Sequence, residues 1–405
     1  MEYNPLDPEV TRNPYPYYAF LRREAPVYRT PLGFAAVSRY ADVFEILRHP
    51  EAFSSSAMGD LIGQVKAMSH EDELGDGETL LGTDPPVHTR LRKIVNRAFT
   101  PRRVAALEPR IRALCAELVD DMVADGDTDL IGALAVPLPV MVIAEILGID
   151  PARRGDFKRW SGELVAATAG TPTPELRAAL ERSGAERTEY LDAVIEQRKA
   201  DPRNDLISAL VQAEADEDIM TENEVGNLIV LLLIAGNETT TNLIGNAVLA
   251  LLSRPDLVDG VQANPALVPA LVEETLRYDS PVQLMLRRAT RSVEISGEKV
   301  GEGELVAVLL GSANRDERQF DEPDVFDLSR DPSRHLAFGF GTHFCLGAGL
   351  ARLEARIALE TFLRRAVRFE LLGPVPGRAP SLLMRGVRSL SLHVTGAGAD
   401  QRAAG

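Results

Sequence analysis

The longest run of hydrophobic positions in the chain follows a helix start signal. Thr221 and Glu224 match a capping box, in which each side chain accepts a hydrogen bond from a backbone N–H of the first turn. Residues 228–234 are all apolar, so the helix that begins here has no polar face and is expected to run through the interior. The apolar run ends abruptly at residues 235–240, Ala-Gly-Asn-Glu-Thr-Thr. A buried helix that presents such groups needs polar neighbours, because an unpaired buried carboxylate is costly.

The polar interruption of this helix permits two interpretations. Thr239 lies four residues after Ala235 and can donate a hydrogen bond to its carbonyl oxygen, which would open the helix locally. Gly236 removes the side chain that would otherwise fill the opening. The segment is therefore either a kinked core helix whose Glu238 points to solvent, or the wall of a buried polar groove.

Other patterns predict more helices and a few strands. The residues after Cys345 and those around Cys115 place apolar side chains at helical spacing, so Cys115 is predicted to be a core residue. Residues 294–310 alternate between polar and apolar, and turn-forming glycines interrupt them, as in a small sheet. The chain is thus predicted to be mainly α-helical with small β-sheets.

Length and composition bound the domain organisation. The chain has 405 residues, of which 45% are hydrophobic, and this is enough to bury a large core. Proline and glycine are scattered, and no linker or internal repeat divides the sequence. We therefore expect a single domain over residues 1–395 and a disordered tail over residues 396–405.

Charge and cysteine content bound the partners and the compartment. The formal net charge of −16 argues against nucleic acid as a partner. Two cysteines in a chain of this length indicate a reducing compartment. Residues 1–24 lack the hydrophobic core of a signal peptide or membrane anchor, and the longest apolar run, residues 228–235, is too short to span a bilayer. We therefore expect a soluble, cytoplasmic protein that does not bind a membrane.

The most informative chemistry lies around Cys345. It occurs in Phe-Gly-Phe-Gly-Thr-His-Phe-Cys-Leu-Gly, residues 338–347, just before a predicted helix. Gly339 and Gly341 permit a tight backbone path, and a helix start favours the thiolate over the thiol. A lone cysteine is more often a small buried hydrophobic residue, but that role does not require three glycines and a histidine nearby. A zinc site with His343 lacks further ligands, and a dinucleotide site lacks the third glycine of its motif.

Residues 338–347 resemble the haem-ligand loop of the cytochrome P-450 superfamily, Phe-Gly-x-Gly-x-His-x-Cys-x-Gly, at every fixed position. Residues 235–239 resemble the distal helix of the same superfamily. The resemblance implies the cytochrome P-450 fold, with haem b between a long distal helix and a proximal loop that carries Cys345 as the axial thiolate to iron. It also implies a soluble bacterial monooxygenase that inserts one atom of O2 into a C–H or C=C bond of an apolar small molecule, as in a hydroxylation. In such an enzyme Glu238 would feed protons inward and Thr239 would position the oxygen.

The resemblance assigns a further set of residues to the haem. It implies that His88, Arg92, Arg287 and His343 contact the two haem propionates through charge-assisted hydrogen bonds. Arg288 is an alternative to Arg287, because a shift of one residue would exchange them. Each of these residues, taken singly, is also compatible with an ordinary surface cation.

A second motif implies a structural role. Glu274 and Arg277 are three residues apart on a predicted helix and can pair. The resemblance makes them a buried pair behind the haem, joined by a third member that is often an arginine. Val325 occupies the expected place of that arginine. The network is therefore either incomplete or completed by another residue such as Arg330.

The resemblance also indicates where the substrate would bind. Two segments, residues 58–68 and 160–173, are expected to contribute to the pocket. Individual side chains are expected from the distal helix, from the stretch after the Glu274 helix and from near the C-terminus, namely Leu231, Ile234, Ala235, Val282, Gln283, Met285, Leu382 and Leu383. Most are aliphatic, which suits a sizeable apolar substrate, although each fits an ordinary core position equally well. Steroids, fatty acids, terpenes, polyketides and drug-like molecules all remain candidates.

No flavin or nicotinamide domain can be recognised, so the resemblance implies that electrons come from a separate acidic ferredoxin or flavodoxin with its reductase. Five basic residues on helices near the cysteine would receive this partner, namely Arg90, Lys93, Arg97, Arg103 and Arg352. Such a cluster is also commonly just a solvated surface. Two other functions stay open: a peroxide-driven haem-thiolate peroxygenase, which usually lacks the acid–threonine pair, and a non-enzymatic haem-thiolate gas sensor, which typically carries an additional module.

Overall fold

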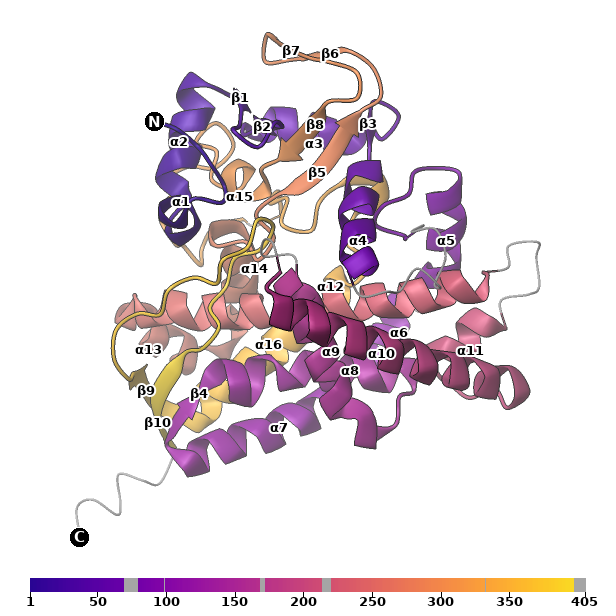
Figure 1. Cartoon of the computed structure of the whole chain (residues 1–405). Helices are drawn as coiled ribbons and strands as arrows, with labels where there is room; N and C mark the ends of the chain where they lie inside the picture. The colour runs from indigo at the N-terminus through magenta and orange to yellow at the C-terminus, as the bar shows by residue number, and fades with distance from the viewer. Residues whose placement is uncertain (69–78, 98, 168–171, 213–219, 332, 397–405) are drawn as a thin grey trace.

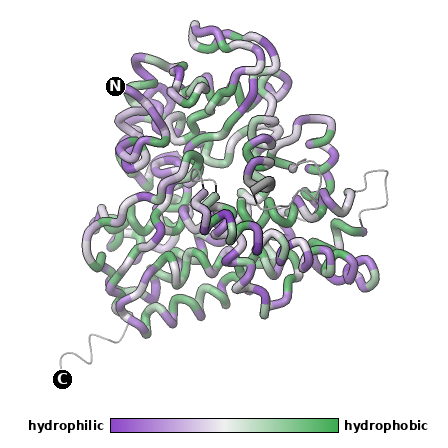
Figure 2. The backbone as a smooth tube through the Cα atoms, in the orientation of Figure 1, coloured by the Kyte–Doolittle hydropathy of each residue, from purple (hydrophilic) through white to green (hydrophobic). Residues whose placement is uncertain are grey.

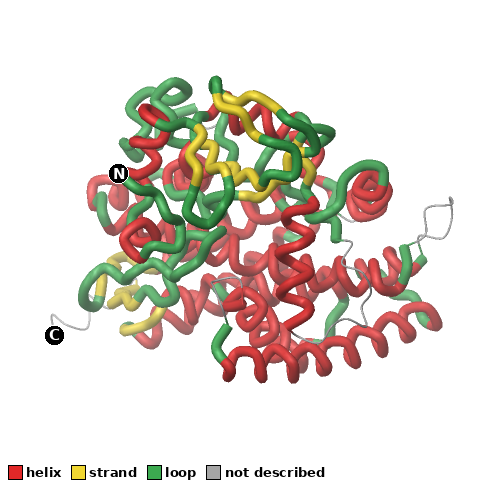
Figure 3. The backbone as a smooth tube through the Cα atoms, turned by 45° about the horizontal axis from the view of Figure 1, so that its top comes forward, coloured by secondary structure: helices red, strands yellow, loops and turns green. Residues whose placement is uncertain are grey.

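The computed structural model describes residues 1–68, 79–97, 99–167, 172–212, 220–331 and 333–396. Helices dominate, and most strands gather at one end of the molecule (Figures 1 and 3). The helices are α1 (Pro8–Arg12), α2 (Tyr15–Glu24), α3 (Tyr40–Arg48), α4 (Ser56–Met68), α5 (Val87–Asn96), α6 (Pro101–Ala106), α7 (Glu108–Asp125), α8 (Pro137–Leu147), α9 (Arg154–Ala167), α10 (Pro174–Ala200), α11 (Leu206–Val211), α12 (Glu222–Leu252), α13 (Pro255–Ala263), α14 (Val268–Tyr278), α15 (Leu310–Ala313) and α16 (Ala348–Arg365).

The strands form three small sheets. They are β1 (Val27–Arg29), β2 (Ala35–Val37), β3 (Phe53–Ser54), β4 (Asp127–Asp129), β5 (Met285–Ala289), β6 (Val293–Ile295), β7 (Glu298–Val300), β8 (Leu305–Val308), β9 (Ala366–Leu371) and β10 (Ser391–Gly396). The largest sheet has the order β1-β2-β8-β5-β3, in which only the β2–β8 pair is parallel. A second sheet has the order β4-β10-β9, and β6 pairs with β7. Mainly helical structure with small sheets is what the sequence predicts.

Helix α12 crosses the middle of the molecule (Figure 1). It begins with the predicted capping box, because the Thr221 side chain accepts from the Glu224 N–H and the Glu224 side chain accepts from the Thr221 N–H. Helices α8, α9, α14 and α16 all pack against it. Residues of α12 therefore contribute to two of the hydrophobic clusters that form the core.

Two further predictions concern local structure. Residues 293–300 form the predicted turn, since Ser296 and Gly297 have positive φ angles of 49° and 82° between β6 and β7. Cys115 is fully buried on α7, as its helical pattern predicts. Hydrophobic and hydrophilic residues alternate along most helices in Figure 2, which is the pattern of amphipathic packing.

The predicted tail begins one residue too early. Gly396 belongs to β10 and is paired with Ala366 of β9, because the strand continues to the end of the three-stranded sheet. Residues 397–405, the rest of that tail, lie outside the described residues.

Helix α12 is long enough and apolar enough to cross a bilayer. Within its residues Asn223–Leu252, an 18-residue stretch has a mean hydropathy of 1.4, although the longest uninterrupted apolar run covers only residues 228–235. The core helix of a soluble protein meets the same criteria, and 61% of this 18-residue stretch is buried inside the fold. Its packing against α8, α9, α14 and α16 is the arrangement of a core helix.

Candidate active site

The loop that carries Cys345 is shaped by its glycines. Gly339 and Gly341 have φ angles of 70° and 69°, which disfavour residues with a Cβ atom. A Cβ on Gly341 would also lie 2.7 Å from the Leu47 carbonyl oxygen at the end of α3. The loop closes on itself, because the Cys345 N–H donates to the Phe338 carbonyl oxygen at 2.9 Å. Cys345 is thereby fixed just before the first residue of α16.

The electrostatic environment of the Cys345 sulfur combines opposing effects. Burial raises the pKa of the thiol above its ordinary value, while the backbone N–H groups of Gly347 and Ala348 and the charge of Arg92 lower it. The helix start thus acts in the predicted direction, but burial has the larger effect on the pKa. A sulfur in this position is suited to share its negative charge with a bound metal cation, which deprotonates a coordinating thiol.

Four basic residues predicted from the sequence come together beside this loop. The rings of His88 and His343 are 4.1 Å apart between centroids. Burial lowers the pKa of His343 to about 3, and His88, Arg287 and Arg92 lower it further through their positive charges. His343 Nε2 also lies 2.9 Å from Ser55 Oγ, at the start of α4. The helices and strands that carry these residues are far apart in the sequence, so the fold itself assembles the cluster.

Two members of the cluster are buried and hydrogen-bond to no carboxylate among the described residues, which tests whether haem fits here. Both ring nitrogens of His88 are buried and have no hydrogen-bond partner in this part of the chain. Arg287 is only 4% exposed and donates a hydrogen bond to the Leu286 carbonyl oxygen at 2.8 Å. Burial lowers the pKa of Arg287 to about 10. Buried cations and donors of this kind need an anionic partner, and the two propionates of haem supply one.

Arg288, the alternative in sequence, is placed differently. It is partly exposed and donates to Asp60 Oδ2 at 2.7 Å and to the Gly303 carbonyl oxygen at 3.0 Å. Its charge is therefore already paired on the surface, whereas Arg287 faces the cluster.

Sequence reasoning missed one acidic residue in this region. Asp84 accepts hydrogen bonds from the Ser55 N–H at 2.9 Å and from Ser54 Oγ at 2.5 Å, and its charge acts on both His88 and Arg287. It therefore holds the segment before α4 against the start of α5, and places Ser55 beside His343. An aspartate directly before Pro85-Pro86 is the sequence signal that points to it, because such residues commonly begin helices and turns.

The distal part of the site lies in the middle of α12. Thr239 Oγ1 donates to the Ala235 carbonyl oxygen at 2.6 Å, the hydrogen bond that the sequence predicts. Ala235 is exposed although most of α12 is buried, and a Cβ on Gly236 would meet no atom within 4 Å. Burial raises the pKa of Glu238, while Asn242 and Arg388 lower it. The polar groove, rather than a solvent-facing carboxylate, is the interpretation that this geometry favours.

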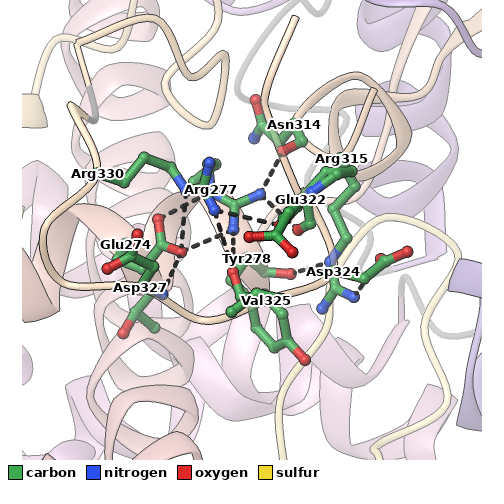
Figure 4. A network of polar contacts seen from close by, with 12 residues as sticks. Glu274, Arg277, Tyr278, Asn314, Arg315, Glu322, Asp324, Val325, Asp327 and Arg330 are labelled. Atoms are coloured by element: carbon green, nitrogen blue, oxygen red, sulfur yellow. Dashed lines mark hydrogen bonds and ion pairs between the residues drawn. The ribbon is translucent and has the colours of Figure 1, made fainter. Parts of the chain in front are cut away.

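The pair Glu274 and Arg277 is buried on α14 (Figure 4). Two hydrogen bonds join them, from Arg277 Nε to Glu274 Oε2 at 2.8 Å and from Arg277 Nη2 to Glu274 Oε1 at 2.7 Å. Arg330 Nε lies 3.5 Å from Glu274 Oε1, so Arg330 takes the place of the missing third member. Val325 contributes its carbonyl oxygen to Arg277 Nη2 at 3.1 Å instead of a side chain.

The predicted pocket residues are either partly accessible, and so free to line a pocket, or buried in other contacts. Val282 forms a β-bridge with Met384, and the Gln283 N–H donates to the Leu383 carbonyl oxygen at 2.7 Å, so these two stretches are neighbours. The residues expected to line the pocket that are only partly buried or exposed are Leu231, Ile234, Ala235, Val282, Met285 and Leu382. Leu383 is buried at 7% exposure. The Gln283 side chain is occupied elsewhere, by hydrogen bonds with Tyr18 Oη and the Ser280 carbonyl oxygen.

The two predicted pocket segments are only partly described. Residues 58–68 belong to α4, and Trp160 packs in the core against Phe157 and Tyr190. Residues 168–171 lie outside the described residues.

The proposed basic cluster is less uniform than the sequence suggests. Arg90 pairs with Glu224 at the start of α12, and Arg352 makes two hydrogen bonds to Glu273, at 2.6 and 3.0 Å. Arg97 and Arg103 are exposed.

Comparisons with known proteins agree with this geometry. The family model for cytochrome P450 matches residues 171–374. The chain is 41% identical to the erythromycin C-12 hydroxylase of Saccharopolyspora erythraea, over 85% of each chain. It is 40% identical to the cyclomarin C epoxidase of Salinispora arenicola, over 87% of this chain and 89% of that one.

A solved structure extends the match to the whole fold. A cytochrome P-450 from Chondromyces apiculatus superimposes with a TM-score of 0.87 at 43% identity, and covers 98% of this chain and 99% of its own. The chain therefore belongs to the cytochrome P-450 family, and it is a monooxygenase whose cofactor is haem with a thiolate ligand.

Proposed function

We propose that this enzyme oxidises a sizeable apolar small molecule at a C–H or C=C bond, with Cys345 as the axial ligand of haem b. The observation that carries the proposal is the convergence of four basic residues beside the Cys345 loop, two of which are buried and hydrogen-bond to no carboxylate among the described residues. Haem with a thiolate ligand activates dioxygen and transfers one of its atoms to an organic substrate. The relatives named above carry out a hydroxylation and an epoxidation, and both reactions are open to this chain.

The protein supplies binding, orientation and proton handling. Cys345 would bind the haem iron, Arg92 and Arg287 would neutralise the propionates, and His88 and His343 would donate hydrogen bonds to them. Glu238, whose pKa burial raises above that of a free carboxyl group, is suited to accept and donate protons. Thr239 presents its hydroxyl where Ala235 and Gly236 leave α12 accessible.

The substrate class is tested by spectral titration. Apolar compounds that include steroids, fatty acids, terpenes and polyketides are added to the purified haem-loaded enzyme, and the ferric absorption spectrum is recorded. We expect a saturable shift for at least one class, with oxygenated product from dioxygen and reductant. Turnover only with peroxide would instead indicate a peroxygenase. Reduction of the haem iron without oxidation of any of the compounds tested would favour a sensor.

Thr239→Ala is expected to uncouple the reaction. Without the hydroxyl, no positioned group directs protons to the bound oxygen, so most electrons should end in peroxide rather than in product. Product and peroxide per electron consumed are measured with a compound identified by the titration. Thr275→Ala is the control, because Thr275 Oγ1 makes the same bond to the carbonyl four residues earlier, at 2.7 Å on α14. Equal coupling in the two variants would remove Thr239 from the proton path.

Arg287→Leu is expected to weaken haem retention, since a buried charge-assisted hydrogen bond contributes about 1.5–3 kcal/mol. Haem release to an acceptor apoprotein should accelerate by roughly tenfold to a hundredfold on that basis. Arg288→Leu is the matched control, because it removes a partly exposed pair that is worth at most about 1 kcal/mol. The assignment fails if the Arg288 variant loses haem as fast as the Arg287 variant.

We propose that electrons come from an acidic ferredoxin or flavodoxin that approaches the surface of α5, α6 and α16. Arg97, Arg103 and Lys93 are among its exposed basic residues, and carboxylates partly neutralise Arg90 and Arg352. Electrostatic steering raises association rates by about tenfold or more and falls with ionic strength. The rate of reduction by a ferredoxin should therefore drop with added salt and in Arg103→Glu, but not in Arg23→Glu on α2. A rate insensitive to both changes would exclude this surface.

We propose that residues 1–396 act as one domain, because the clusters of the core draw on helices from both halves of the chain and β10 ends at Gly396. We also propose a cytoplasmic location, which the low cysteine content supports.

A further inference from the structure

A serine on a neighbouring helix contacts α12 beside the candidate catalytic residues. Ser161 of α9 donates from Oγ to the Leu233 carbonyl oxygen at 3.2 Å and accepts from Asn237 Nδ2 at 3.2 Å. Ser161 is 5% exposed and Asn237 is 4% exposed, so both bonds are shielded from water. Hydrogen bonds in such surroundings are stronger than on the surface.

The two contacts lie within a single turn of α12. In an α-helix the carbonyl of Leu233 accepts a hydrogen bond from the N–H of Asn237. The Ser161 hydroxyl is thus a second donor to a carbonyl of the helical backbone. Two residues further along the helix, the Thr239 hydroxyl donates to the Ala235 carbonyl in the same way. Gly236 lies between these positions and borders open space. The backbone here is thus held by side chains as well as by its own ladder.

Asn237 depends on this contact for its orientation. Its Oδ1 atom is buried and has no hydrogen-bond partner among the residues that the structure describes. The bond from Nδ2 to Ser161 is therefore the polar interaction that fixes the amide, and Glu238 is the next residue along the helix.

We propose that Ser161 is a positioning residue for the oxygen-handling groove. Through Asn237 and the Leu233 carbonyl it fixes the turn of α12 that carries Glu238 and Thr239, although it touches neither of their reactive atoms. The proposal rests on the assignment of these two residues above, but its consequence for the backbone can be measured independently of catalysis.

The first test is hydrogen–deuterium exchange of the haem-loaded enzyme. In Ser161→Ala, the amides of residues 233–240 should exchange about fivefold faster, as expected for loss of one buried hydrogen bond. Peptides from the end of α12, residues 245–252, serve as the internal reference and should not change. Ser183→Ala is the matched control, because Ser183 is also fully buried and bonds a backbone carbonyl at 3.2 Å, but within its own helix α10.

The second test uses carbon monoxide as a probe of the groove. The C–O stretching band of the reduced, CO-bound protein reports the polar groups near the bound gas. It should shift and broaden in Ser161→Ala and keep its wild-type position in Ser183→Ala. Asn237→Leu should reproduce the Ser161→Ala result, and the double variant should add little, because both changes remove one connection.

The outcomes separate this proposal from the proposed function. Wild-type exchange and an unchanged CO band in both Ser161→Ala and Asn237→Leu would overturn the positioning role. If Thr239→Ala shifts the band and Ser161→Ala does not, the groove assignment stands and Ser161 is excluded. If Ser161→Ala loosens residues 233–240 while Thr239→Ala leaves coupling intact, the contact is real but the catalytic assignment of Thr239 fails.

Discussion

Replacing Cys345 by serine is expected to abolish both the thiolate spectrum and substrate oxidation. The loop places this sulfur beside Arg92 and in front of the backbone N–H groups of Gly347 and Ala348, and a serine hydroxyl cannot supply the same electron density to iron. The variant protein is reduced and exposed to carbon monoxide, and the red-shifted absorption that a thiolate produces opposite the gas should disappear. Oxidation of a titration-identified substrate should fall below detection.

The matched control is Cys115→Ala. Cys115 is fully buried on α7, and burial raises the pKa of its thiol to about 12, so it packs as an apolar residue. That variant should keep the spectrum and the activity of the wild-type enzyme. A haem-loaded Cys345→Ser protein that retains the red-shifted band would show that another group binds the iron.

Arg277→Ala should produce the largest loss of stability among these variants. Removing one member of a buried ion pair costs about 3–5 kcal/mol, since the remaining charge stays in the interior. Here Glu274 would lose both of its bonds to Arg277 and keep the more distant Arg330, and the carbonyl groups of Asn314 and Pro323 would lose this donor. A domain has roughly 5–15 kcal/mol of stability in total, so the holoenzyme should accumulate poorly.

Urea unfolding and haem content measure this effect. Lys199→Ala is the control, because Lys199 and Glu196 have the same three-residue spacing on α10 but are 36% and 66% exposed. An exposed pair contributes about 0–1 kcal/mol, so this variant should unfold at nearly the wild-type urea concentration. A similar midpoint for both variants would mean that the buried pair does not stabilise the fold.

Local patterns predicted the helices and their chemistry well. The capping box, the apolar stretch of α12 and the Thr239–Ala235 hydrogen bond all follow from residues within a few positions of one another. The turn between β6 and β7 is equally local. Interactions between residues close in the sequence determine these features, so a single sequence is enough to predict them.

Contacts between distant segments could not be predicted in the same way. Asp84 bonds to Ser55, 29 positions earlier, and Ser161 bonds to Asn237, 76 positions later. The strands of the largest sheet are only two to five residues long, so their pairing has no periodic signal of its own. Arg330 reaches Glu274 because the loop between them folds back, and the sequence motif alone suggested only that some residue should do so.

The acidity of Cys345 shows where a local argument is insufficient. The helix start lowers the pKa of the thiol as predicted, but the surrounding packing raises it more. Burial depends on the whole fold, so an argument from the helix start alone cannot give the direction of the net pKa shift.

The two loop glycines differ in what a directed-evolution library can exchange. Both have positive φ angles, which asparagine tolerates better than other residues with a Cβ atom. At Gly339 a new Cβ would have its nearest neighbour 3.9 Å away, at the His343 carbonyl oxygen, so asparagine is sterically admissible. At Gly341 the Leu47 carbonyl oxygen at 2.7 Å blocks every side chain. Randomisation that aims to retune the redox behaviour of the haem can therefore include position 339 and should leave position 341 fixed.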